Sequence, residues 1–111
     1  MGESTAYSSR EYDIADVLVT LARQAQAGEV KLRLYGDQRV VYIDQGRTFL
    51  DYLCDTDMGE MLTALATADL FSADTEECGR TIEDLKDLKA KSKAWLSSVD
   101  PRDGSLRFYC D

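Results

Sequence analysis

The chain has 111 residues and a formal net charge of −8, from 13 basic and 21 acidic residues, and it contains no histidine. A chain of this length suits one domain, and its excess of acid disfavours nucleic-acid binding, which needs clustered Lys and Arg. Because the usual general base, and with it the usual partner of a Ser or Cys nucleophile, is missing, we do not expect an enzyme.

Composition also bears on the compartment. No apolar run approaches the roughly 20 residues of a membrane span, and the polar segment from Met1 to Ser9 does not resemble a signal peptide. Cys54, Cys78 and Cys110 are odd in number and widely spaced, with no CxxC pair. We therefore expect reduced thiols, no metal site, no cofactor and a cytoplasmic protein without membrane contact.

The first predicted element is an amphipathic helix. Its apolar residues recur at the spacing of one helical face. Asp13 is a plausible N-cap, and Gly28 lies where a left-handed C-cap is expected. The stripe consists of Ile14, Val17, Leu18, Leu21, Ala22 and Ala25.

A β-hairpin follows the helix. Two runs, 30–35 and 38–43, flank the pair Gly36-Asp37, and Gly at the first central position suits a type II′ turn. A two-residue loop places Leu32 opposite Val41 and Val30 opposite Ile43, so that apolar groups share the inner face. A register shifted by one residue would move them to the other face.

A third strand is predicted over 47–53, after a three-residue turn in which Gly46 is left-handed. This register places Phe49 beside Val41 on the inner face. A two-residue turn would instead send Thr48 and Leu50 inward; we favour the first arrangement.

Two helices and a closing strand complete the chain. The first helix covers 57–71, where Asp57 and Glu60 have the spacing of a capping box. The second covers 81–97, and 105–110 is read as a strand after the break at Pro101. The fold class is therefore α+β, in the order α-β-β-β-α-α-β, with a small antiparallel sheet packed against helices. Residues 1–111 form a single domain, in which 1–11 are expected to be flexible.

The net charge resides in one block of the sequence. Residues 48–79 contain eight acids and no base, whereas the flanking segments nearly balance. The functional interpretation is a surface that meets a basic partner; the alternative is solubility and helix capping. The candidate residues are Asp69, Asp74, Glu76 and Glu77.

The predicted outer face of the sheet is a second candidate surface. Aromatic residues and Arg are enriched in protein interfaces. This face would carry Tyr35, Val40, Tyr42, Leu50 and Tyr52 beside Lys31 and Arg33. The alternative is that the later helices cover this face and make it a second core layer. Both interpretations remain open at this point.

Three strings suggest a family. They are 16–22 (DVLVTLA), 28–32 (GEVKL) and 39–47 (RVVYIDQGR), and Gly104 to Phe108 adds a "G-x-x-x-F" strand. Together they resemble the amino-terminal domain of PatA-type bacterial signalling proteins, which has a leucine-rich helix, a "G-x-L-x-L" strand and a strand ending in "I-x-x-G-R/K". The resemblance implies a non-catalytic module associated with response regulators, motility or development, and it offers no catalytic residue.

We therefore expect a non-catalytic protein-protein interaction module in bacterial regulation or signalling, with another protein as partner and homodimerisation as an open possibility. Two alternatives remain. One is a small acidic inhibitor, such as an immunity or anti-defence protein, that covers a basic surface. The other is a chaperone like those of type III secretion, which bind an unfolded effector segment.

Overall fold

The computed structural model describes residues 13–98 and 104–110, so the expectation that 1–11 are flexible lies outside the described residues. One helix is followed by a two-stranded hairpin, then by three helices and a last strand, so the sheet is built from strands that are far apart in the sequence. The elements are α2 (Ile14–Gln24), β1 (Val30–Tyr35), β2 (Gln38–Ile43), α3 (Gly46–Asp55), α4 (Met58–Thr67), α5 (Cys78–Leu96) and β3 (Leu106–Cys110).

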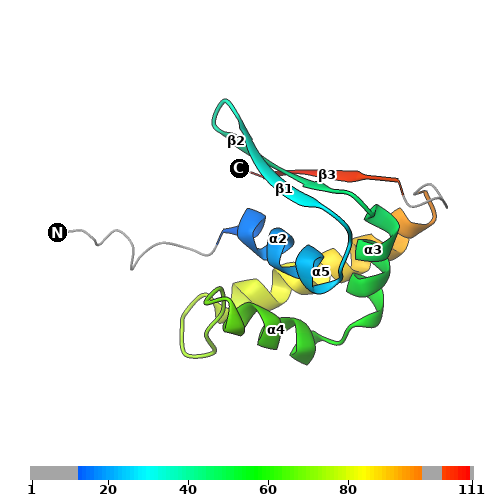
Figure 1. The fold of residues 1–111 in the computed structure, drawn as a ribbon. Coiled ribbons are helices and arrows are strands. Elements are labelled where there is room, and N and C mark those ends of the chain that lie inside the picture. The colour runs from blue at the N-terminus through cyan, green and yellow to red at the C-terminus, as the bar shows by residue number, and fades with distance from the viewer. Residues whose placement is uncertain (1–12, 99–103, 111) are drawn as a thin grey trace.

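The sheet and the helices form separate layers (Figure 1). The three strands are antiparallel in the order β1-β2-β3, with β2 at the centre. The described helices all lie on one side of this sheet, with α2 against β1 and β2. The predicted α+β class, with a small antiparallel sheet packed against helices, is confirmed.

The predicted hairpin register is also confirmed. Val30 pairs with Ile43 and Leu32 with Val41, and the two-residue loop closes on Tyr35 and Gln38. Gly36 has a φ of 62°, whereas Asp37 is not among the residues with positive φ. This combination fits the expected type II′ turn, since a type I′ turn needs positive φ at both central positions.

The predicted third strand over 47–53 is wrong, because this segment is the helix α3. Gly46, Phe49, Leu50 and Leu53 are buried at i, i+3, i+4 and i+7, which is a helical stripe. Gly46 is not left-handed; it is the first residue of the helix, and its N–H donates to the carbonyl of Gly104 at 3.0 Å. Phe49 and Leu50 therefore both enter the core, rather than opposite faces of a sheet.

A lysine from another helix closes the C-terminal end of α3. The Nζ of Lys89 on α5 donates to the carbonyl oxygens of Leu53 at 2.8 Å and Thr56 at 2.5 Å, and it lies 3.4 Å from that of Cys54. The last carbonyls of a helix have no partner within the helix, and a cation there also complements the helix dipole. This contact fixes α3 against α5.

The first helix begins as predicted but ends differently. Asp13 is the N-cap and accepts a hydrogen bond from the N–H of Ala15 at 2.9 Å. The left-handed residue after the helix is Gln26, with a φ of 56°, and the next N–H, that of Ala27, donates to Ala22 at 3.1 Å, as in a Schellman motif. Gly28 also has positive φ, but it serves the loop into β1, where a Cβ would lie 2.6 Å from the carboxylate of Asp44.

The remaining elements agree with the sequence to within a turn. Asp57 caps α4 by accepting from the N–H of Glu60 at 2.9 Å, as the capping-box pattern predicts. α4 ends at Thr67 rather than 71, and α5 begins at Cys78 rather than 81.

An aromatic cluster joins the two layers. The ring of Phe108 on β3 lies 5.8 Å from that of Phe49 and 5.7 Å from that of Trp95, both in edge-to-face geometry. These rings come from β3, α3 and α5, so the closing strand is packed against α3 and α5.

Candidate binding face of the sheet

Alternation along the strands defines one uncovered face, which we name the outer face. β1 contributes Lys31, Arg33 and Tyr35; β2 contributes Gln38, Val40 and Tyr42; and β3 contributes Arg107 and Tyr109. In the part of the chain that the structure describes, no helix lies on this side of the sheet (Figure 1). Of the two interpretations left open by the sequence, covering by the later helices is not observed, because α3, α4 and α5 lie on the other side of the sheet.

Val40 lies fully buried at the centre of the outer face, although its neighbour Val41 is the one in the main core. It pairs with Arg33 on one side and with Tyr109 on the other. The side chains of Tyr35 and Tyr42 are hydrogen-bonded to each other from the strand positions on either side of it. Because no described helix covers this face, side chains of the face itself shield Val40 from solvent.

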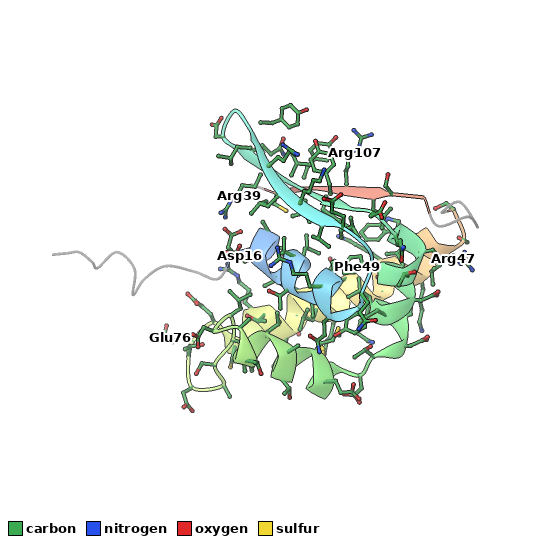
Figure 2. All side chains as sticks on the ribbon, in the orientation of Figure 1. Asp16, Arg39, Arg47, Phe49, Glu76 and Arg107 are labelled. Atoms are coloured by element: carbon green, nitrogen blue, oxygen red, sulfur yellow. The ribbon has the colours of Figure 1, made fainter. Side chains whose placement is uncertain are left out.

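The outer face combines aromatic rings with cations. Tyr35 is 63% exposed and Tyr109 is 59% exposed, and Lys31, Arg33 and Arg107 are also exposed. Lys31 has an acidic neighbour, Glu29, with a charge separation of 3.7 Å. In a chain of net charge −8, this face is a local concentration of basic groups. Figure 2 shows Arg107 on the side of the sheet away from the helices.

A shallow groove runs over this face. Its volume is about 540 Å³. Lys31, Arg33, Tyr35 and Tyr42 form much of its lining, and Glu29 and Asp44 lie at its end. Its basic and aromatic lining distinguishes it from the groove beside α4, which contains Asp57 and Glu60.

The pKa shifts at and near the surface run in the wrong direction for acid-base or thiol chemistry at neutral pH. The hydrogen bond with Tyr35 raises the pKa of Tyr42, and partial desolvation and the nearby Tyr109 add to the shift. Burial raises the pKa of the Cys54 thiol, and Asp55 adds to it. Both groups therefore stay protonated near pH 7, whereas a nucleophile needs a lowered pKa. Within 13–98 and 104–110, no cluster of three or more acidic or cysteine side chains could hold a metal ion.

Tyr52 does not belong to the outer face, contrary to the prediction. It lies on α3 and is half-buried against the core. Burial, followed by the charge of Glu60, raises the pKa of Tyr52. The error has the same cause as the misassigned strand, since alternation places side chains on the two faces of a strand but not of a helix.

The acidic candidates lie elsewhere. Asp69, Asp74 and Glu76 are exposed in the segment between α4 and α5, and Glu77 directly precedes α5. Figures 1 and 2 show this segment, where Glu76 is labelled, on the far side of the helices from the sheet. The predicted residues therefore form two separate surfaces, one basic and aromatic and the other acidic.

Two residues of the outer face were missed in the sequence. Arg107 and Tyr109 alternate with Leu106 and Phe108 in β3, so the period of two was visible. Their position beside Val40 and Tyr42 depends on β3 pairing with β2, which the sequence does not reveal.

Comparison with protein-family models, with curated proteins and with solved structures finds no match to this chain. In the described residues, no helix combines the length and apolar character needed to span a membrane.

Proposed function

We propose that this chain is a non-catalytic protein-binding module and that the outer face of its sheet is the binding surface. The observation that carries the proposal is an uncovered sheet face on which Tyr35, Tyr42 and Tyr109 lie beside three cations. Tyr and Arg are the residues that most often dominate the binding energy of protein interfaces, together with Trp.

The arrangement also lowers the entropic cost of binding. Side chains that must be ordered on association cost roughly 0.5–1.5 kcal/mol each. Tyr42 is already held by Tyr35 and half-buried over Val40, so part of this cost is met before a partner arrives. The strands beneath fix the spacing of the rings.

A protein fits the charge distribution better than a nucleic acid does. The outer face has three cations, but the chain as a whole carries a net charge of −8, which repels a polyanion at long range. Side chains such as Arg33 and Arg107 match single carboxylates on a partner, where bidentate pairing gives specificity.

The resemblance to PatA-type signalling proteins supports bacterial regulation as the setting of this module. The alternative of an acidic inhibitor would use the surface formed by Asp69, Asp74, Glu76 and Glu77 instead. Because this surface lies on the other side of the helices, the two proposals can be tested with separate sets of variants.

The test is affinity capture from cells of the source organism, with nuclease-treated extract, followed by binding kinetics with the protein captured. Tyr109→Ala and Arg107→Ala should each raise the dissociation rate, by about tenfold or more if they are hot spots. The control is Lys86→Ala, an exposed cation on α5. Capture that survives Tyr109→Ala and Arg107→Ala but is lost with Asp74→Asn and Glu76→Gln would contradict the proposal and favour the acidic surface. Capture abolished by nuclease would indicate nucleic acid instead.

A further inference from the structure

The strand β1 forms a free edge of the sheet. The strand order leaves its second side without a neighbouring strand in the described part of the chain. Every residue of β1 after Val30 is exposed. Free edges are the sites at which proteins add an extended segment as a further strand.

The hairpin geometry determines which backbone groups are available at this edge. Because the two-residue loop closes on Tyr35 and Gln38, these two residues form a hydrogen-bonded pair. Alternation then directs the N–H and C=O groups of Arg33 and Lys31 toward β2. The corresponding groups of Leu34 and Leu32 point outward, and in the described chain no backbone hydrogen bond to another segment satisfies them.

The side chains of β1 provide two different surfaces beside these groups. On the inner side, Leu34 is 70% exposed and Leu32 is 38% exposed, because the end of the hairpin extends past the helices (Figure 1). The sequence places Leu32 on the inner, core-facing side. It is partly exposed because the helices do not reach this part of the hairpin. On the outer side, Lys31 and Arg33 carry positive charge.

We propose that the edge of β1 binds an extended segment of the partner as a fourth, antiparallel strand, in which acidic and apolar side chains alternate. Residues directly opposite each other in an antiparallel pair project on the same face. The acidic side chains would therefore lie opposite Lys31 and Arg33, and the apolar ones opposite Leu32 and Leu34. This inference rests on the proposed function, since it names the segment that the module recognises.

A second copy of this chain fits the edge less well. The two antiparallel registers that pair most of β1 with itself are centred on Arg33 and on Leu32. In the first, Arg33 would lie opposite itself; in the second, Lys31 would lie opposite Arg33. Like charges directly opposite each other destabilise a strand pair, and natural edge strands carry Lys and Arg to prevent self-association.

The probe is an acetylated and amidated hexapeptide of alternating glutamate and valine, titrated into the full chain labelled with ¹⁵N. The largest shifts of amide resonances should be those of Leu32 and Leu34, with new protection from hydrogen exchange. A peptide of alternating lysine and valine should bind at least several-fold more weakly. Methylation of the valine nitrogens should abolish binding, because these N–H groups face Leu32 and Leu34, whereas methylation of the glutamate nitrogens should not.

Two substitutions at one position separate the backbone from the side chain. Leu34→Pro removes only an outward N–H, so the hairpin ladder stays intact, as edge positions allow; it should abolish binding of the peptide. Leu34→Thr keeps the N–H and should retain binding. Arg33→Glu should weaken binding by about fivefold, and Lys86→Glu, with the same charge change on exposed α5, should not.

The outcomes also separate this inference from the proposed function. If the peptide does not bind, or binds equally to Leu34→Pro, strand addition is overturned; the outer face still stands if Tyr109→Ala weakens the captured partner. If sedimentation shows a dimer that Leu34→Pro converts to a monomer, the occupant is a second copy and the proposal of an acidic segment fails. If methylated glutamate nitrogens block binding and methylated valine nitrogens do not, the added strand is not antiparallel.

Discussion

Tyr35 and Tyr42 are hydrogen-bonded across the outer face, from strand positions on either side of the pair Arg33–Val40. The bond joins the last residue of β1 to the penultimate residue of β2. It accounts for the raised pKa of Tyr42, and it lies on the face where Val40 is fully buried although no described helix covers it.

This hydrogen bond makes the stability of the folded protein depend on pH in the alkaline range. The pKa of Tyr42 is raised above its ordinary value of 10.0 in the folded protein. The contribution of Tyr42 to the unfolding free energy is therefore fully present below pH 10.0. It is lost as pH rises through the folded pKa, because Tyr42 loses its proton first in the unfolded chain. In Tyr42→Phe this part of the alkaline loss should disappear, as measured by urea unfolding below and above that pH.

Tyr52 provides a comparison for the same experiment. Burial raises the pKa of Tyr52 as well, so Tyr52→Phe should also reduce the alkaline loss of stability. Tyr35→Phe removes the partner that raises the pKa of Tyr42, so it should reduce the part of the loss that comes from Tyr42. The double variant Tyr35→Phe with Tyr42→Phe should show the same alkaline loss of unfolding free energy as Tyr42→Phe alone. A different loss would contradict the assignment of the pKa shift to the hydrogen bond between the two tyrosines.

Truncation of Val40 and Val41 to alanine should lower the unfolding free energy by different amounts, although both side chains are fully buried. Val41→Ala leaves a cavity beneath packed helices and should cost about 2–3 kcal/mol. Val40→Ala should cost about 1 kcal/mol, because surface side chains above it can relax. Leu32→Ala, at 38% exposure, should cost less than Val41→Ala. Equal, large losses at Val40 and Val41 in urea unfolding would mean that the outer face is covered in solution.

Gly46 should tolerate no larger residue. A Cβ at this position would lie 2.5 Å from the carbonyl oxygen of Gly104 and 2.5 Å from Leu106. Gly46→Ala should therefore destabilise the protein by about 1–3 kcal/mol despite its better helix propensity. Gly79→Ala is the matched control, since Gly79 also lies in the first turn of a helix but has open space around it. It should be neutral or stabilising by up to about 1 kcal/mol in thermal unfolding; equal losses at both sites would contradict the close approach to Gly104.

Replacement of Lys89 should lower the unfolding free energy far more than replacement of a neighbouring lysine on α5. Lys89→Met removes the hydrogen bonds to the carbonyls that end α3 and should cost about 1.5–3 kcal/mol. Lys91→Met is the control, because Lys91 forms an exposed i,i+4 ion pair with Asp87 at 2.8 Å. Such pairs contribute about 0.5 kcal/mol or less. The difference in unfolding free energy between the two variants measures the cap, and the absence of any difference would rule it out.

Local patterns in the sequence predict most of the fold. The caps at Asp13 and Asp57 and the register of the hairpin follow from residues close in sequence, and each is confirmed. The segment 47–53 was misread because Phe49 and Leu53 satisfy both a period of two and a helical spacing. The buried set with Gly46 and Leu50 favours the helix, and the contacts that decide it, to Gly104 and Lys89, come from distant parts of the chain.

The candidate site was predictable only in part. Tyr35 and Tyr42 follow from alternation in two strands joined by a short turn. Arg107 and Tyr109 complete the same face only because β3 lies against β2, and this pairing is set by the packing of Phe108 rather than by any local motif.

The pairing of β3 with β2 also has a kinetic consequence. Ile43 meets Leu106 only after the chain has closed a loop that contains α3, α4 and α5. Helices and short hairpins form within microseconds, whereas distant strand pairing must first overcome the entropy of loop closure. Docking of β3 is therefore expected to limit the folding rate. Docking of β3 is stabilised by the contacts of Phe108 with Phe49 and Trp95. Because these contacts form in the rate-limiting step, Phe108→Leu should slow refolding more than it speeds unfolding in stopped-flow measurements.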